Sequence, residues 1–254
     1  MIELGDVTKT FPNGTRAVDG VSLRVAAGEF VSLLGPSGCG KSTLLRITAG
    51  LAPPTSGTVA APWLNGGRDA GGQLGYVFQQ PTLLPWSSVS SNVYLPLRLA
   101  GRRRRDAAPL VDAALEMVGL SDFRRARPRE LSGGMQMRVS VARALVGQPT
   151  ALLLDEPFAA LDEITRNRID DDLLKLWTQQ RWAAVFVTHS VYEAVYLSTR
   201  VLVMSPRPGR IIDEIAIDLP QPRTPAVRGL PRFAELCERV SAALAAGMEA
   251  TANA

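Results

Sequence analysis

The chain has 254 residues, of which 46% are hydrophobic and 20% are charged, as in ordinary folded globular proteins. Its length allows one large domain or two modest ones. The 28 basic and 24 acidic residues leave a net charge of +4, too small for a basic nucleic-acid-binding domain. The four-arginine run Arg102–Arg105 is interpreted as a solvated loop before a helix.

The opening residues, Met1–Asp6, lack the basic segment and apolar run of a signal peptide. No stretch approaches the roughly 18 apolar residues that span a bilayer, so any membrane role is expected to come through a partner. Cys39 lies in a glycine-rich loop where a disulfide would block a ligand, which favours a reducing compartment. Cys237 falls on an apolar helix face and is expected in the core.

The first third of the chain predicts short strands over Ile2–Phe11, Ala17–Val25 and Phe30–Leu34. Pro12-Asn13-Gly14 is a turn signal between the first two. The third strand runs into the run Gly35–Thr43, whose first eight residues fit the pattern G-x-x-x-x-G-K-[ST], and a helix is expected over Leu44–Leu51. Strand, glycine loop and helix in this order predict a phosphate-binding loop.

In the middle of the chain the predicted elements change from short strands to helices. Short strands are predicted at Thr58–Ala61 and Leu74–Phe78, and the pattern is then helical from Val89 to Leu145. We interpret residues 88–147, approximately, as a helical subdomain inserted into a nucleotide-binding core. The later part predicts a helix over Asp162–Gln180, a final apolar helix stripe, and strands at Ala151–Leu154, Ala183–Val187, Val201–Met204 and Ile211–Ile217. Strands that alternate with helices predict an α/β fold with a largely parallel sheet.

The phosphate-loop residues have the chemistry that a nucleotide needs. Glycines let backbone N–H groups approach phosphate oxygens, and the N-terminus of the following helix adds partial positive charge. Lys41 is expected to reach the β- and γ-phosphates, and Ser42 to ligate Mg²⁺.

Two carboxylates follow a buried strand. Asp155 comes directly after four apolar residues and is expected to hold Mg²⁺ or its water. Glu156 comes next, points differently and is suited to orient an attacking water as general base. A paired surface carboxylate is the simpler interpretation of either residue, but it is weak at this spacing behind a phosphate loop.

Two more polar residues end predicted strands. His189, the single histidine of the chain, follows Ala183–Val187 and Thr188, and we expect it to contact the γ-phosphate. Gln79 follows Tyr76-Val77-Phe78, and its amide is expected to sense Mg²⁺ or the attacking water. Gln79 alone is weak evidence.

A second glycine-rich run, Leu131-Ser132-Gly133-Gly134-Met135, precedes a helix expected over Met135–Val146. Ser132 is predicted to cap this helix. The same geometry, a hydroxyl with bare glycine amides and a helix dipole, is suited to a phosphate. Both interpretations are compatible.

Together these motifs resemble the ATP-binding-cassette (ABC) ATPase family, over residues 2 to 215 approximately. The resemblance implies a P-loop NTPase of ABC type, with a parallel-sheet core, an antiparallel β subdomain and the inserted helical subdomain, over residues 1–218. Residues 219–254 then form a C-terminal linker and helix. The implied cofactors are ATP and Mg²⁺. The implied site residues are catalytic Lys41, Glu156 and His189; metal-binding Ser42, Gln79 and Asp155; and nucleotide-binding Phe11, Gly35, Ser37, Gly38, Cys39, Gly40, Lys41, Ser42, Thr43, Gln79, Ser132, Gly133, Gly134 and Met135.

By this likeness Phe11 stacks on adenine, and ATP is sandwiched in a dimer between the phosphate loop of one chain and the Leu131–Met135 signature of the other. Met135 departs from the glutamine of many members, and Met137 from a usual polar residue. Neither departure removes Ser132 or the glycine amides, so nucleotide contact is expected to survive.

Three segments are similar to the nitrate/sulfonate/taurine branch of bacterial importers: Leu83–Trp86, Glu156–Asp162 and Met204–Ile211. In that branch the ATPase is a separate chain that drives a membrane permease fed by an extracytoplasmic binding protein. The resemblance implies that residues 80–98, approximately, dock the permease, at the cytoplasmic face of the membrane. Two alternatives are a soluble ABC ATPase without a transport role and an inactive regulatory cassette.

Overall fold

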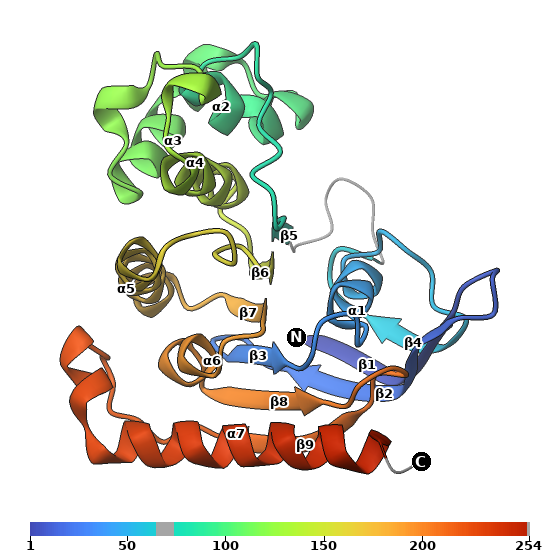
Figure 1. Cartoon of the computed structure of the whole chain (residues 1–254). Coiled ribbons are helices and arrows are strands. Elements are labelled where there is room, and N and C mark those ends of the chain that lie inside the picture. Colours follow the sequence, from blue (N-terminus) through green and yellow to red (C-terminus); the bar gives the residue numbers. More distant parts are fainter. Residues whose placement is uncertain (65–73, 253–254) are drawn as a thin grey trace. The chain divides into compact units, whose positions relative to one another are not determined.

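The computed structural model describes residues 1–64 and 74–252 (Figure 1). The chain forms two compact units. The first unit comprises residues 1–72 and 181–254, and the second comprises residues 73–180. None of the helices in the described part is long and apolar enough to cross a membrane.

An antiparallel sheet opens the first unit. Its strands are β1 (Ile2–Thr10), β2 (Arg16–Val25) and β4 (Ser56–Ala60), in the order β2-β1-β4. Buried residues alternate with exposed ones along the second half of β2, the pattern of a sheet with one covered face. The antiparallel β subdomain expected from the sequence is therefore present.

A mainly parallel sheet completes this unit. Strand β3 (Phe30–Leu34) lies between β7 (Ala183–Thr188) and β8 (Arg200–Met204) and is parallel to both, and β9 (Ile211–Ala216) pairs antiparallel with β8. All residues of β3 and β7 are buried, as in strands covered on both faces. This confirms the parallel core.

Three helices and one 3₁₀ turn belong to the same unit. They are α1 (Lys41–Thr48), α6 (Val191–Leu197), η3 (Pro225–Gly229) and α7 (Pro231–Ala252). Helix α7 lies along β8 and β9 (Figure 1) and buries Phe233, Leu236, Cys237 and Val240. The expected core position of Cys237 is therefore correct.

The second unit combines a strand pair with helices. Strands β5 (Leu74–Val77) and β6 (Ala151–Asp155) are parallel, with Val77 opposite Leu154. The helices are α2 (Val89–Leu99), α3 (Arg104–Met117), α4 (Gly133–Leu145) and α5 (Glu163–Gln180), with 3₁₀ turns η1 (Ser121–Phe123) and η2 (Pro128–Glu130).

Several helix boundaries differ from the expectation, and the following three differences bear on the predicted motifs. Helix α1 begins at Lys41 rather than Leu44, because Gly40 already serves as its N-cap. Helix α4 begins at Gly133 rather than Met135, because Ser132 caps it there. Helix α3 takes in Arg104 and Arg105, so only half of the four-arginine run is a loop.

Candidate active site

The phosphate loop connects β3 to α1 and encloses the side chain of Lys41. That side chain is only 3% exposed, and its ammonium donates hydrogen bonds to the carbonyls of Gly35 at 2.8 Å and Pro36 at 3.0 Å. Gly38 and Gly40 have φ of 76° and 110°, which side chains rarely adopt. A Cβ on Gly40 would lie 2.5 Å from the carbonyl oxygen of Ala17. The glycines are therefore required by the backbone itself.

The first turn of α1 is open to an anion. Its N-cap, Gly40, supplies no side-chain hydrogen bond, and the first turn contains no acidic residue. The N–H groups at a helix start lack partners within the helix and carry partial positive charge. With the Lys41 ammonium beside them, these groups suit phosphate oxygens.

His189 follows β7 directly, at the sheet edge from which the phosphate loop also starts. Strands β3 and β7 are parallel neighbours, and Leu34 at the end of β3 pairs with Thr188 at the end of β7. The next residues along the two strands are Gly35 and His189, and the His189 side chain is exposed. The first unit thus brings the histidine and the phosphate loop to the same sheet edge, where ligands of α/β sheets gather.

Phe11 follows β1 in a tight turn. Its carbonyl accepts from the N–H of Gly14 at 2.9 Å, and its own N–H donates to the Thr15 carbonyl at 2.9 Å. The ring is 40% exposed, with the Lys9 ammonium 5.8 Å from its centroid. An exposed aromatic face held by a rigid turn is suited to stacking on a planar base.

In the second unit, Asp155 and Gln79 follow neighbouring parallel strands. Asp155 ends β6 and is 4% exposed, with the Tyr76 hydroxyl 3.5 Å from its Oδ2. Gln79 comes two residues after β5 and is exposed. Since Val77 pairs with Leu154, both polar side chains come from the same end of this strand pair.

Glu156 has an unusual backbone. Its φ is 44°, in the left-handed region that glycine favours. Such conformations cost about 1–3 kcal/mol and persist where the surroundings impose them, often at functional sites. This geometry turns the Glu156 side chain away from the direction that a continued strand would give it.

Ser132 caps α4 as predicted, but the helix already begins at Gly133, so both glycines of the signature lie in its first turn. The Ser132 hydroxyl accepts a hydrogen bond from the N–H of Met135 at 3.3 Å, which makes Ser132 the N-cap. Gly133 is exposed and a Cβ on it would meet open space, so packing does not require glycine at this position. A Cβ on Gly134 would lie 3.0 Å from Cγ2 of Thr165 on α5. Gly134 therefore lets the two helices pack closely.

Met137 departs from the family pattern for a structural reason. It is 3% exposed on α4 and belongs to the core of its unit, whereas Met135 is half-buried. An apolar side chain at position 137 thus contributes packing, and neither methionine alters the Ser132 cap.

Two polar side chains, those of Asn92 and Arg143, hold the backbone of the segment from residue 80 to residue 98 and are its anchors. Asn92 is fully buried and bonds the backbone of the preceding turn. Arg143 of α4 donates to the carbonyls of Pro81 and Thr82 at 2.8 and 2.9 Å, and burial lowers its pKa. Trp86, between these anchors, is 72% exposed. A large aromatic side chain on a fixed turn is typical of a contact surface.

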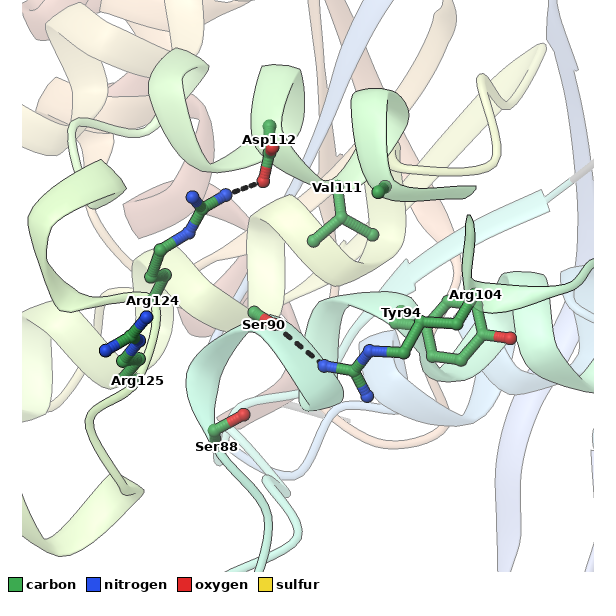
Figure 2. Close-up of a pocket in the computed structure, with 9 residues that line it drawn as sticks. Ser88, Ser90, Tyr94, Arg104, Val111, Asp112, Arg124 and Arg125 are labelled. Carbon is green, nitrogen blue, oxygen red and sulfur yellow. Dashed lines mark hydrogen bonds and ion pairs between the residues drawn. The ribbon is translucent and has the colours of Figure 1, made fainter. Parts of the chain in front are cut away.

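A pocket of about 470 Å³ adjoins this segment (Figure 2). Figure 2 shows Arg104 extended across Tyr94, with its guanidinium 5.6 Å from the ring centroid, and an ion pair between Arg124 and Asp112. The pocket is lined by Ser88, Ser90, Tyr94, Arg104, Ala108, Val111, Asp112, Arg124 and Arg125. Three arginines and one aspartate make this surface basic.

Each unit carries side-chain oxygens of the kind that Mg²⁺ prefers. Ser42 offers a hydroxyl in the first unit, and Asp155 and Gln79 offer a carboxylate and an amide oxygen in the second, all hard oxygen ligands. Mg²⁺ is usually held by one or two such protein groups together with substrate phosphates and water. When bound, the metal neutralises phosphate charge and orients the phosphate oxygens. The first residue belongs to the first unit, and the other two belong to the second.

Sequence reasoning missed two contacts of these sites. The Arg207 guanidinium donates to the Gly38 carbonyl through Nε at 3.1 Å and Nη2 at 2.9 Å. The Tyr76 hydroxyl faces Asp155. The run Pro206–Arg210 gives a partial signal for the Arg207 contact. Its prolines and glycine indicate a fixed loop backbone, but not which group the arginine bonds.

Comparison with known proteins agrees with this geometry. A family model described as "ABC transporter" matches residues 18–159. The aliphatic sulfonates import ATP-binding protein SsuB 2 of Burkholderia cenocepacia is 46% identical over 225 residues, covering 88% of this chain and 80% of that protein. The taurine import ATP-binding protein TauB of Rhizobium johnstonii is 43% identical over 235 residues, covering 90% of this chain and 88% of that protein.

A solved structure has the same fold. The ATP-binding cassette MJ0796, in a dimeric post-hydrolysis state bound to ADP and Pi, is 34% identical. The alignment covers 85% of this chain and 99% of that one, with a TM-score of 0.76. The fold and the phosphate-binding chemistry inferred above are thus those of an ATP-binding cassette.

Proposed function

This chain belongs to the ATP-binding-cassette family of transporter ATPases, and from that premise we propose that it is the ATP-hydrolysing subunit of an importer of the nitrate/sulfonate/taurine type. The observation that carries the proposal is an intact set of ATPase residues on a chain that aligns over most of its length with import ATP-binding proteins. Lys41, Asp155, Glu156 and His189 are all in place.

We propose that residues of the first unit bind the nucleotide. Phe11 stacks on the base, the amides of the phosphate loop hold the β-phosphate, and the Lys41 ammonium exchanges its carbonyl partners for β- and γ-phosphate oxygens. Ser42 supplies a metal ligand. His189, on the strand next to β3, contacts the γ-phosphate.

Hydrolysis then requires a water and a base. Glu156 accepts a proton from the attacking water, Asp155 would hold the metal when it is bound, and Gln79 would sense the metal or the water. Positioning and charge neutralisation supply most of the rate in phosphoryl transfer, so the assembly of these groups decides turnover. Closing the site excludes water and is a gating step.

A second copy of the chain completes the site. In our proposal the amides of Gly133 and Gly134 and the Ser132 hydroxyl contact the γ-phosphate bound by the partner. The exposed Ser132 and Gly133 at the start of α4 support this assignment. The related cassette MJ0796 is dimeric with ADP and Pi bound.

The permease docks on the segment 80–98 and its basic pocket. Exposed Trp86, the fixed turn at Asn92 and the arginines of Figure 2 support this surface. Docking places the chain at the cytoplasmic face of the membrane, and an extracytoplasmic protein delivers the solute to the permease.

The experiment is to purify the chain with its genomic partners from membranes and reconstitute the complex in liposomes. We expect magnesium-dependent ATP hydrolysis that rises when the solute-loaded binding protein is added outside. Trp86→Ala should weaken recovery with the permease, whereas Met248→Ala removes an exposed apolar side chain on α7, outside this surface, and serves as the control. Recovery with ribosomes or DNA in place of a permease contradicts the importer assignment.

A further inference from the structure

The loop Ser205–Arg210, which follows β8, has no part in the reaction proposed above, yet it packs against the phosphate loop. The Gly209 N–H donates to the Ala17 carbonyl at 3.0 Å, and the Gly209 carbonyl accepts from the Asp19 N–H at 3.0 Å. A Cβ on Gly209 would lie 2.1 Å from the carbonyl oxygen of Cys39. The two loops are therefore in direct backbone contact.

Side chains hold the shape of this loop. The Ser205 hydroxyl lies 2.9 and 3.0 Å from the carbonyls of Pro206 and Pro208, and its oxygen accepts from the Arg210 N–H at 3.0 Å. The Arg210 Nε donates to the Asp19 carboxylate of β2 at 2.7 Å. Asp19 is only 9% exposed, so this ion pair is partly shielded from solvent. The loop thus forms a firm platform.

Arg207 reaches from this platform to the phosphate loop. Its guanidinium places two donors on one acceptor, the Gly38 carbonyl, at 3.1 and 2.9 Å. Hydrogen bonds from a charged donor are stronger than neutral ones, and two parallel donors fix direction as well as distance.

Fixing that carbonyl also fixes an amide. The peptide unit is planar and trans, so the N–H of Cys39 points opposite to the carbonyl of Gly38. Amides of this loop are the groups that contact phosphate oxygens. The Cys39 N–H lies 3.4 Å from the Pro36 carbonyl, and so long a hydrogen bond competes weakly with a phosphate oxygen.

We propose that Arg207 is a positioning residue that sets the Gly38–Cys39 peptide in its phosphate-binding orientation before the nucleotide arrives. Preorganisation of this kind raises affinity because the loop loses less freedom on binding. The proposal rests on the nucleotide site assigned above to Gly35–Thr43. Arg207 is exposed, so solvent screens its charge and the charge alone contributes little to nucleotide affinity. The two hydrogen bonds to the Gly38 carbonyl are what orient the peptide.

The test compares Arg207→Ala, Arg207→Lys and the full chain, alone and in its complex. Nucleotide affinity is measured with a fluorescent ATP analogue, and KM and kcat by phosphate release. For Arg207→Ala, Kd and KM should rise about five- to tenfold, from the loss of one charged hydrogen-bonded contact. The value of kcat at saturating ATP should stay within about twofold. Arg207→Lys keeps the charge with a single-point donor and should recover part of the affinity.

Two controls separate this inference from its premise. Arg232→Ala removes an exposed guanidinium of the same unit, paired with Asp218 and Glu235, and should leave both constants unchanged. Lys41→Ala should abolish nucleotide binding, and a Lys41→Ala variant that binds like the wild type would refute the nucleotide site itself. If Lys41→Ala fails to bind while Arg207→Ala binds normally, only the role of Arg207 is overturned.

A purely structural role for Arg207 predicts a different result. In that case the melting temperature of the nucleotide-free protein and kcat fall together with affinity, and Arg207→Lys recovers none of them. That pattern also overturns the proposal.

Discussion

The side-chain amide of Asn92 bonds both backbone groups of Leu84. Its Oδ1 accepts from the Leu84 N–H at 2.7 Å, and its Nδ2 lies 3.2 Å from the Leu84 carbonyl. The same Nδ2 lies 3.2 and 3.1 Å from the carbonyls of Ser87 and Ser88. One fully buried amide therefore holds the turn that presents Trp86.

Asn92→Ala should loosen that turn. Removing the amide leaves the part-buried Leu84 N–H without this acceptor, and we expect a loss of about 1–3 kcal/mol in the free energy of unfolding. The surface for the permease should be lost with it, so chemical denaturation and co-purification with the permease both report the change. Gln179→Ala, an exposed amide near the end of α5, is the control. Unchanged permease binding in a destabilised Asn92→Ala would show that the turn is not the docking element.

The local motifs of the site were predictable from sequence. A phosphate loop needs glycines at left-handed positions and a lysine at the helix start, and these requirements fall within nine consecutive residues. The Ser132 cap is likewise decided within three residues of the helix start. Short-range backbone requirements leave a direct signature in residue order.

The long-range contacts left no such signature. Arg207 and Gly38 are 169 residues apart, and nothing in a proline-rich loop states which carbonyl its arginine reaches. From the sequence, Asn92 cannot be told apart from other polar residues on a predicted helix. Its hydrogen-bond partners lie in the turn before the helix, and no local pattern marks that pairing. The predicted start of α4 falls two residues too late because glycine has low helix propensity, which the cap geometry overrides. The predicted start of α1 falls too late because Lys41–Thr43 also belong to the phosphate-loop motif.

Glu156→Gln should trap an ATP-bound dimer. The amide keeps the size of the side chain but cannot accept the proton of the attacking water. We expect turnover to fall by about 10²–10⁴-fold, the usual contribution of a general base, with ATP binding retained. Size-exclusion chromatography with ATP and Mg²⁺, with and without the permease, measures the dimer.

The control for that substitution is Glu238→Gln, an exposed carboxylate on α7, which should hydrolyse ATP like the wild type. A Glu156→Gln protein that remains monomeric in both conditions contradicts the general-base assignment.

Substitution of Ser132 should separate binding from turnover. If Ser132 acts on the nucleotide held by the partner chain, Ser132→Ala leaves ATP binding by the monomer nearly intact and abolishes hydrolysis. The same change removes a helix cap, which costs about 1 kcal/mol. Ser132→Asn restores a cap without restoring the hydroxyl, so it should recover the melting temperature and not the turnover.

Equal losses of monomer binding and turnover in Ser132→Ala would place Ser132 in the site of its own chain. Recovery of turnover in Ser132→Asn would instead reduce its role to capping α4. Nucleotide titration of the monomer and steady-state hydrolysis by the complex distinguish these results.

The thiol of Cys237 should make stability fall at alkaline pH. Burial on α7 raises its pKa to about 11, from an ordinary value of 9.0. Between these two values the folded chain keeps a proton that the unfolded chain has released, so stability decreases as pH rises. The stabilising contribution is therefore complete below pH 9 and lost on passing pH 11, by at most about 3 kcal/mol. Urea denaturation at pH 8, 9.5 and 10.5 should show a shallower pH slope for Cys237→Ala than for the wild type, because other alkaline groups titrate alike in both proteins. Identical slopes would mean that the folded protein does not hold this thiol in its protonated form.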